Sequence, residues 1–211
     1  MSLLYEKLED YCTLNSSHIP DYLVDLERET HIKTLNPRML TGPLQGRLLS
    51  LISKMIQPTG ILEIGTFTGY SCLCLAEGLQ KNGILDTIEI NEELKPVIYK
   101  YVSKSPFSTQ ITIHFGDAMK ILETLSGKYQ LVFIDAAKED YIDYYERIFD
   151  QVESGGIILA DNVLWSGKVI SDPQDETTRC IHKFNRHVLS DKRVENVVLP
   201  VRDGLNIIRK K

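Results

Sequence analysis

The sequence predicts an α/β protein with a mostly parallel sheet and helices on both of its faces. Strand-like and helix-like segments alternate between residues 60 and 190, and the short apolar strand segments end in glycines or acids. The chain then closes with two strand-like segments around Asp203-Gly204. Alternation of this kind is typical of parallel strands joined by helical crossovers. In such sheets ligands bind beyond the carboxyl ends of the strands.

The N-terminal region is helical in pattern, with a break at "NSSHIP". Ser16 or Ser17 is a candidate cap for a helix that begins after Pro20. The following segment, "PLQGRLLSLISKMI", places its leucines and isoleucines largely on one helical face despite Gly46. We therefore expect three helices before the first strand.

Five strands are expected in the middle of the chain, with helical stretches between them. They are residues 60–65, 84–90, 110–115, 129–134 and 155–160. A long helix at about 174–189 follows them. The final segment, "VENVVLPVRDGLNIIRK", reads as two short strands around a turn at Asp203-Gly204, which predicts a hairpin.

Length and composition indicate one ordinary globular domain. The chain has 211 residues, of which 43% are hydrophobic and 25% are charged, and its net charge of −5 argues against a nucleic-acid surface. No apolar run approaches the roughly 18–20 residues of a membrane span. The start, "MSLLYEKLED", is too charged for a secretory signal, so we expect a cytoplasmic protein without a membrane segment. Cys72 and Cys74 form no CxxC pair, and we expect them to be packing residues.

All five strands are followed by polar groups at their carboxyl ends. In chain order the polar residues are Glu63, Glu89, Asp117, Asp135, Lys138, Asp161 and Asn162, and Gly65 and Ala118 lie beside them. Because the carboxyl ends of parallel strands meet at one edge of a sheet, these groups should converge. Scattered surface charges would not favour that edge, so we expect a functional site there.

The stretch "ILEIGTFTGYS" narrows the choice of ligand. Phe67 stands where the dinucleotide fingerprint G-x-G-x-x-G needs its second glycine, and no P-loop lysine follows. Glu63 would repel a pyrophosphate, but it suits a ligand with an ammonium group and a sulfonium, which S-adenosylmethionine (SAM) has. Gly65 would let the backbone approach the methionine part, and Ser71 near the helix start would bind its carboxylate.

The next two strands complete this interpretation. Glu89 lies 24 positions after Gly65, where nucleotide-binding α/β folds place an acid for the ribose hydroxyls. Asp117 and Ala118 would then lie beside the adenine. The alternative is that the glycines only make a tight strand-to-helix turn.

Asp135, Asp161 and Asn162 form a second candidate set. Two carboxylates and one amide are hard oxygen ligands, which favour Mg²⁺, Mn²⁺ or Ca²⁺ over zinc. The alternative is that Asp161-Asn162 only caps the loop after its strand.

These motifs together resemble the cation-dependent O-methyltransferases, the family of animal catechol and plant caffeoyl-CoA O-methyltransferases, and look closest to its small bacterial members. The match runs through "MLTGPLQGRLL", "ILEIGTFTGYS", "TIEIN", "GDAM", "FIDAAKEDY", "LADNVLWSGKV" and "LPVRDGLNIIRKK". The resemblance implies a Rossmann-like SAM-dependent methyltransferase fold, with a seven-stranded, mostly parallel sheet and an antiparallel C-terminal hairpin strand. It divides the chain into an N-terminal helical extension, residues 1–40, for substrate and dimer contacts, and a methyltransferase domain, residues 41–211.

The resemblance also implies roles for individual residues. SAM contacts fall on Thr41, Glu63, Gly65, Phe67, Ser71, Glu89, Ala118 and Asp135. Metal ligation falls on Asp135, Asp161 and Asn162, and the general-base role falls on Lys138. Met39, Tyr141, Trp165 and Lys168 are candidates for the mouth of the substrate site, because their segments flank the cofactor and metal loops.

The expected reaction is in-line methyl transfer from SAM to a hydroxyl held by the divalent cation. The expected acceptor is a small vicinal-dihydroxy phenol of the catechol or hydroxycinnamate type, and the resemblance suggests a homodimer. One alternative is methylation of a hydroxyuridine in tRNA, a role of some bacterial relatives, for which Lys33, Arg38, Lys168 and Arg202 would supply a basic rim. Another is a non-catalytic SAM-binding protein.

Overall fold

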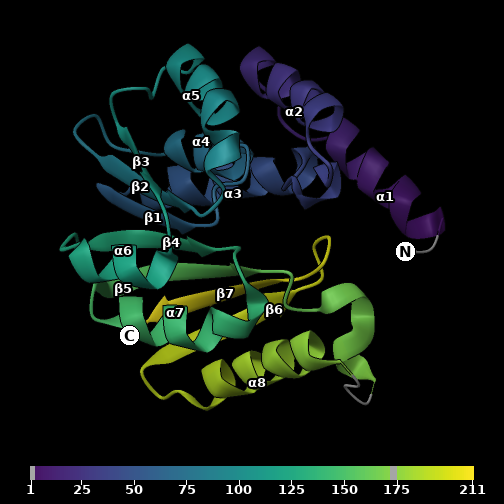
Figure 1. Cartoon of the computed structure of the whole chain (residues 1–211). Helices are drawn as coiled ribbons and strands as arrows, with labels where there is room; N and C mark the ends of the chain where they lie inside the picture. Colours follow the sequence, from purple (N-terminus) through teal and green to yellow (C-terminus); the bar gives the residue numbers. More distant parts are fainter. Residues whose placement is uncertain (1–2, 172–174) are drawn as a thin grey trace.

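The computed structural model describes residues 3–171 and 175–211, and it forms one sheet between two layers of helices (Figure 1). The strands are β1 (Gly60–Ile64), β2 (Ile84–Glu89), β3 (Ile111–Phe115), β4 (Tyr129–Ile134), β5 (Val152–Asp161), β6 (Val194–Leu199) and β7 (Leu205–Lys210). The α-helices are α1 (Leu3–Leu14), α2 (Asp21–Lys33), α3 (Pro43–Ile56), α4 (Tyr70–Ala76), α5 (Lys95–Lys104), α6 (Ala118–Thr124), α7 (Tyr141–Phe149) and α8 (Glu176–Ser190). Short 3-10 helices are η1 (Pro37–Met39), η2 (Glu92–Leu94), η3 (Lys138–Asp140) and η4 (Trp165–Ile170).

The seven strands lie in the order β3-β2-β1-β4-β5-β7-β6. The pairs among the first five are parallel, whereas β7 runs antiparallel to both of its neighbours, β5 and β6. The hairpin β6–β7 turns at the predicted Asp203-Gly204, where Gly204 has a φ of +91°. The predicted seven-stranded fold with an antiparallel C-terminal hairpin strand is confirmed.

Helices cover the two faces of the sheet with separate apolar cores (Figure 1). Helices α2, α3, α4 and α5 supply buried side chains to one core, and α6, α7 and α8 supply the other. Every residue of β1 is buried, as expected for a central strand with both faces covered. The predicted packing role of Cys72 and Cys74 is confirmed, because both are buried free thiols in α4.

Gly46 has a packing reason inside α3. A Cβ atom there would lie 2.6 Å from Cε1 of Tyr70 and 2.9 Å from Sγ of Cys74. The missing side chain lets α3 and α4 approach closely, which compensates for the low helix propensity of glycine.

Two boundaries differ from the sequence-based expectation, and a third lies where the structure gives no description. The predicted cap at Ser16 or Ser17 is wrong, because α2 follows Pro20 directly without a side-chain cap. Strand β5 begins at Val152 rather than at residue 155, since Val152 pairs with Tyr129 across a shift in register that the pattern does not reveal. The expected start of α8 at residue 174 lies outside the described residues. None of the described helices is both long and apolar enough to cross a membrane.

Candidate active site

The strand order brings the predicted site residues to one edge of the sheet. From β1 the chain builds outward through β2 and β3 on one side, and β4 and β5 lie on the other side. The switch point therefore falls between β1 and β4, where Gly65 and Asp135 follow the two strands. Open α/β sheets bind ligands at such a point.

Glu63, within β1, has a relative exposure of 0%. Its Oε2 accepts a 2.5 Å hydrogen bond from the hydroxyl of Thr87, while Oε1 has no partner among the described residues. Burial raises the pKa of Glu63 to about 8. The nearby Ser71 hydroxyl acts in the opposite direction and lowers this pKa, although it does not have the geometry of a hydrogen bond to Glu63. A buried carboxylate oxygen without a partner is costly, so this position favours a cationic ligand.

The turn after β1 connects the first two strands of the site. Gly65 has a φ of +102°, and a Cβ atom there would overlap the carbonyl oxygen of Asp135. Phe67 has a φ of +49°, and its backbone N–H donates a 2.7 Å hydrogen bond to Oε2 of Glu89. The other oxygen of Glu89 accepts from Asn91 N at 2.8 Å. Each oxygen keeps a lone pair for a ribose hydroxyl.

Three further cofactor candidates lie in defined surroundings. Asp117 caps α6 by accepting a 3.0 Å hydrogen bond from Lys120 N, so it has a structural role of its own. Ala118 begins that helix and is half-buried. Thr41 is buried, and its carbonyl oxygen accepts a hydrogen bond from Arg202. Contacts of these residues with a cofactor stay predictions.

The predicted metal residues follow the adjacent strands β4 and β5. Asp161 is only 2% exposed, and its Oδ1 accepts a 2.7 Å hydrogen bond from Asn162 N. Burial and then the nearby charge of Asp135 raise the pKa of Asp161. Asn162 adopts a φ of 57°, which turns the chain directly after the strand. Two neighbouring carboxylates with poor solvation suit a divalent cation.

The described residues include no group of three or more His, Cys, Asp and Glu side chains placed to hold a metal. The predicted metal set has two carboxylates and the amide of Asn162, so it is not a group of this kind. Metal binding by Asp135, Asp161 and Asn162 stays a prediction.

Lys138 lies at the start of η3 and is largely buried. Its Nζ donates 2.7 Å hydrogen bonds to Oδ1 of Asp135 and to the hydroxyl of Tyr141. The hydroxyl of Tyr141 in turn lies 3.0 Å from the carbonyl oxygen of Asp161 and 3.2 Å from that of Ile134. The prediction that Tyr141 lines the substrate mouth is wrong, because its side chain is fully buried beneath Lys138.

Gln45 on α3 is a polar residue that sequence reasoning missed. It is fully buried, and both polar atoms of its amide lack hydrogen-bond partners in the described part of the chain. It lies close enough to Asp161 to favour the ionised carboxylate, without the geometry of a hydrogen bond. The helical pattern of "PLQGRLL" places Gln45 beside apolar positions, and this placement could have indicated that its amide is buried.

The β6–β7 turn holds two loops of the site together. Arg202 donates hydrogen bonds to the carbonyl oxygens of Leu40, at 2.7 Å, and Thr41. On the other side, Val163 N donates to Gly204 O at 3.1 Å and Leu164 N donates to Asp203 O at 2.9 Å. Residues near the C-terminus therefore position the loops that follow η1 and β5.

The predicted mouth residues differ in exposure. Met39, in η1, is 59% exposed, whereas Trp165 is half-buried against the core that α7 and α8 share. Lys168 is exposed and pairs with Asp175 at 2.9 Å. Met39 and Trp165 stay predictions as substrate contacts.

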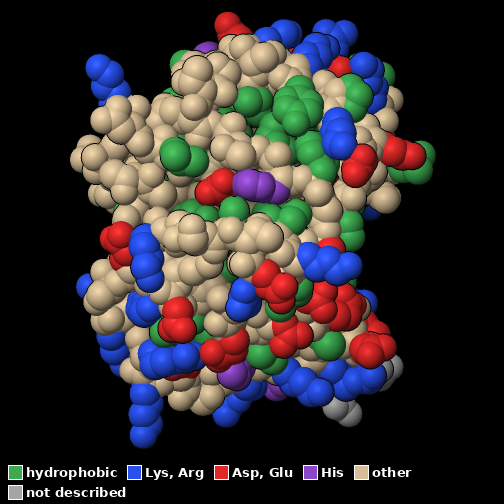
Figure 2. Space-filling model, turned by 60° about the vertical axis from the view of Figure 1, so that its left-hand side comes forward, with side chains coloured by type: hydrophobic (Ala, Val, Ile, Leu, Met, Phe, Trp, Pro, Cys, Tyr) green, Lys and Arg blue, Asp and Glu red, His purple; other side chains and the backbone are tan. Residues whose placement is uncertain are grey.

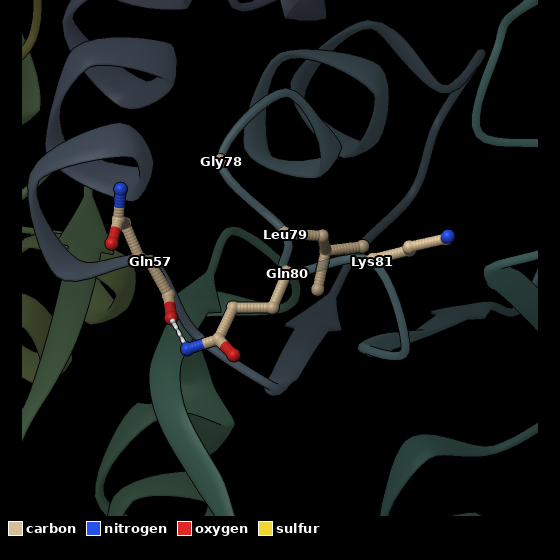
Figure 3. A pocket seen from close by; sticks show the side chains of 5 residues that line it. All are labelled: Gln57, Gly78, Leu79, Gln80 and Lys81. Carbon is tan, nitrogen blue, oxygen red and sulfur yellow. Dashed lines mark hydrogen bonds between the residues drawn. The ribbon is translucent and has the colours of Figure 1, made fainter.

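A surface hollow lies away from these residues (Figure 3). It has a volume of about 380 Å³ and is lined by Gln57, Gly78, Leu79, Gln80 and Lys81. In Figure 3, Gln80 reaches back to the carbonyl oxygen of Gln57, at 2.7 Å. Because these residues lie near the amino end of β1, the hollow is at the opposite end of the strand from Gly65.

Comparison with known proteins identifies the family. A family model described as O-methyltransferase matches residues 13–211, which includes part of α1 and everything after it. The chain belongs to the O-methyltransferase family. This confirms the predicted family and the predicted enzyme class, a SAM-dependent O-methyltransferase.

Individual relatives agree with this assignment. A caffeoyl-CoA O-methyltransferase of Stellaria longipes is 32% identical, over 100% of this chain and 97% of its own length. The SAH-bound structure of the Podospora anserina methyltransferase PaMTH1 has a TM-score of 0.90 and 29% identity, covering 99% of this chain and 95% of that one. TomG of Streptomyces achromogenes, an O-methyltransferase solved with SAM, shares the fold with a TM-score of 0.92 at 24% identity, and each chain covers all of the other.

Proposed function

We propose that this O-methyltransferase transfers a methyl group from SAM to one hydroxyl of a small vicinal-dihydroxy phenol of the catechol or hydroxycinnamate type, with the help of a divalent cation. The observation that carries the proposal is the buried carboxylate of Asp161, which lies beside the charge of Asp135 and near Lys138. The caffeoyl-CoA O-methyltransferases among the relatives support an acceptor of this class.

The residues at the switch point fit SAM. The unpartnered Oε1 of Glu63 suits an ammonium group. The absent side chain of Gly65 makes room for the carbonyl oxygen of Asp135, so that the turns after β1 and β4 approach closely at the proposed cofactor site. Glu89 presents carboxylate oxygens for the ribose hydroxyls. SAM supplies the reaction with an electrophilic methyl group on a sulfonium. The chain's part is to hold that group in line with the acceptor oxygen.

The oxygen set of Asp135, Asp161 and Asn162 fits Mg²⁺, Mn²⁺ or Ca²⁺ better than a soft metal. A cation bound there would act as a Lewis acid on the acceptor and lower the pKa of its hydroxyl. Asp161 supports this fit because burial and the charge of Asp135 raise its pKa, and a positive charge would relieve both effects.

Lys138 is the proposed general base. The hydroxyl of Tyr141 and the carboxylate of Asp135 hold its Nζ beside the ends of β4 and β5. In its neutral form the amine would accept the proton of the reacting hydroxyl. A neutral amine has two N–H groups and one lone pair. When the two N–H groups donate to Asp135 and Tyr141, the lone pair stays available for the proton of the acceptor.

The N-terminal extension, residues 1–40, is proposed to contribute substrate and dimer contacts. Met39 and Trp165 would contact the acceptor. Exposed apolar side chains on α1 and α3 support association into a homodimer. They are Leu4, Leu8, Tyr11, Leu14, Leu51 and Met55.

The tRNA alternative finds less support in the surface charges. Lys33 pairs with Glu29, Lys168 pairs with Asp175, and Arg202 lies 3.8 Å from Glu9, so these cations are largely compensated. On the face drawn in Figure 2, Lys and Arg side chains are interspersed with Asp and Glu. A small-molecule acceptor is consistent with such a surface.

A methyl-transfer assay with mass-spectrometric detection tests the proposal. SAM and a 3,4-dihydroxycinnamate acceptor are supplied with Mg²⁺ or with EDTA, and 4-hydroxycinnamate serves as the matched acceptor without a vicinal hydroxyl. We expect one added methyl group on the dihydroxy acceptor only, and none with EDTA. Equal product in EDTA would contradict the cation. Methylation of hydroxyuridine-containing tRNA, without phenol turnover, would support the alternative.

A further inference from the structure

The two carboxylate oxygens of Glu63 have unequal surroundings. Thr87 lies opposite Glu63 in the β1–β2 register, and its hydroxyl donates to Oε2 at 2.5 Å. Oε1 is buried and has no hydrogen-bond partner among the described residues. Oε2 is therefore fixed by the protein. Oε1 accepts no hydrogen bond from the described residues, although the Ser71 hydroxyl lies near the carboxyl group, and it is the oxygen left for a further donor.

A second threonine continues the hydrogen-bonded chain. Thr66, in the turn after β1, places its hydroxyl 2.5 Å from that of Thr87, and both side chains are buried. A hydroxyl has one proton, and Thr87 gives its own to Glu63. Thr87 must then accept from Thr66, so the chain runs from Thr66 through Thr87 to Glu63. All its protons point toward the carboxylate, which stabilises the ionised form.

The charges around Glu63 indicate what the donor must be. The charged groups with the largest effect on it are Asp135 and Glu89, which are both carboxylates. Ionised Glu63 therefore lacks a compensating cation from these neighbours. Its position in β1, before the turn at Gly65, is the position proposed for the amino-acid end of SAM.

We propose that Thr87, supported by Thr66, is a positioning residue for SAM: it holds Oε2 of Glu63 so that Oε1 receives the ammonium group of the cofactor. This inference rests on the proposed SAM site and assigns a binding role to two strand and turn residues outside it. Glu89, the proposed ribose acid, receives its hydrogen bonds from the backbone of Phe67 and Asn91 and not from the hydroxyls of Thr66 and Thr87.

The test compares two ligands by calorimetry. S-adenosylhomocysteine carries the ammonium group, and 5′-methylthioadenosine lacks the whole amino-acid part but keeps the ribose and adenine. Thr87→Val removes the hydroxyl and retains the branched shape. We expect this variant to bind S-adenosylhomocysteine about tenfold or more weakly, in line with a lost hydrogen bond to a charged group. Its affinity for 5′-methylthioadenosine should stay within about twofold of the unmodified protein's. Thr87→Ser should restore the affinity.

Two controls keep the outcomes distinct. Thr178→Val removes another buried threonine hydroxyl that donates to a carboxylate, that of Asp175 at the start of α8, and should bind both ligands normally. Thr66→Val should show the effect of Thr87→Val in weaker form. If Thr87→Val bound S-adenosylhomocysteine with unchanged affinity, or bound both ligands equally weakly, this inference would be overturned. The proposed function would not be affected by that result. If the unmodified protein bound neither ligand, the proposed function would fail with it.

Discussion

Lys138 donates a 2.7 Å hydrogen bond to the hydroxyl of Tyr141, a side chain with no exposed surface. The Tyr141 ring also packs edge-on against Phe184 of α8, with centroids 5.3 Å apart. The proposed base is thus anchored to the core that α7 and α8 form.

Tyr141→Phe should lower kcat for methyl transfer by about ten- to a hundredfold. The change removes the neutral acceptor of Lys138, and a hydrogen bond to a charged group contributes about 1.5–3 kcal/mol. The phenyl ring preserves the packing on Phe184, so S-adenosylhomocysteine affinity should stay within about twofold. Single-turnover kinetics and calorimetry measure the two effects. An unaltered kcat would contradict a role of Tyr141 in holding the base.

Asp161→Ala should abolish cation-dependent turnover, with a loss of at least about a hundredfold, because the variant lacks a buried carboxylate that we propose as a ligand to the cation. Binding of SAM should remain largely intact, since Asp161 is not among the predicted SAM contacts. Mn²⁺ binding followed by electron paramagnetic resonance gives a readout independent of turnover. Asp150→Ala, at an exposed acid after α7, is the matched control and should bind Mn²⁺ normally. Full activity of Asp161→Ala would refute the metal assignment.

Glu63 should make stability depend on pH. Burial raises its folded-state pKa to about 8, with Asp135 and Glu89 acting in the same direction, while its ordinary value is 4.5. The folded protein then holds the proton more tightly, so this contribution is complete below about 4.5 and is lost as pH rises through about 8.

Urea unfolding of the ligand-free protein between pH 5 and 9 measures this effect. In the unmodified protein, Glu63 should lower the free energy of unfolding by at most about 1.4 kcal/mol per pH unit as pH rises. The Glu63→Gln variant should lack this contribution. Since the glutamine side chain of this variant does not titrate, the difference between the two curves isolates Glu63 from Asp161. Parallel curves would show that Glu63 is already ionised in the folded protein.

Gly204→Ala should destabilise the fold by about 2–3 kcal/mol. Gly204 has a φ of +91°, and a Cβ atom there would overlap the side chain of Leu164. A left-handed conformation at a non-glycine residue costs about 1–3 kcal/mol even without a clash. Urea midpoints measure the change, with Gly167→Ala as the control, because its φ is +78° but its surroundings are open. Equal urea midpoints for both variants would show that the contact with Leu164 adds nothing to the cost of the backbone conformation.

The sheet and most of the strand ends follow from local patterns in the sequence. Alternating apolar and helical segments require parallel strands, and parallel strands place their carboxyl ends at one edge. Glu63, Glu89, Asp135 and Asp161 could therefore be assigned to one site before any coordinates were known. This inference needs only local patterns and chain direction.

The support of those side chains, in contrast, depends on tertiary packing. Tyr141 is three residues from Lys138, but the pattern could not indicate whether its hydroxyl faces solvent or the core. Gln45 reaches Asp161 from α3, and Thr87 reaches Glu63 across the β1–β2 register. Arg202 and Gly204 link the hairpin turn to loops far away in the chain. Such contacts join residues distant in sequence, and their geometry depends on packing that no local period encodes.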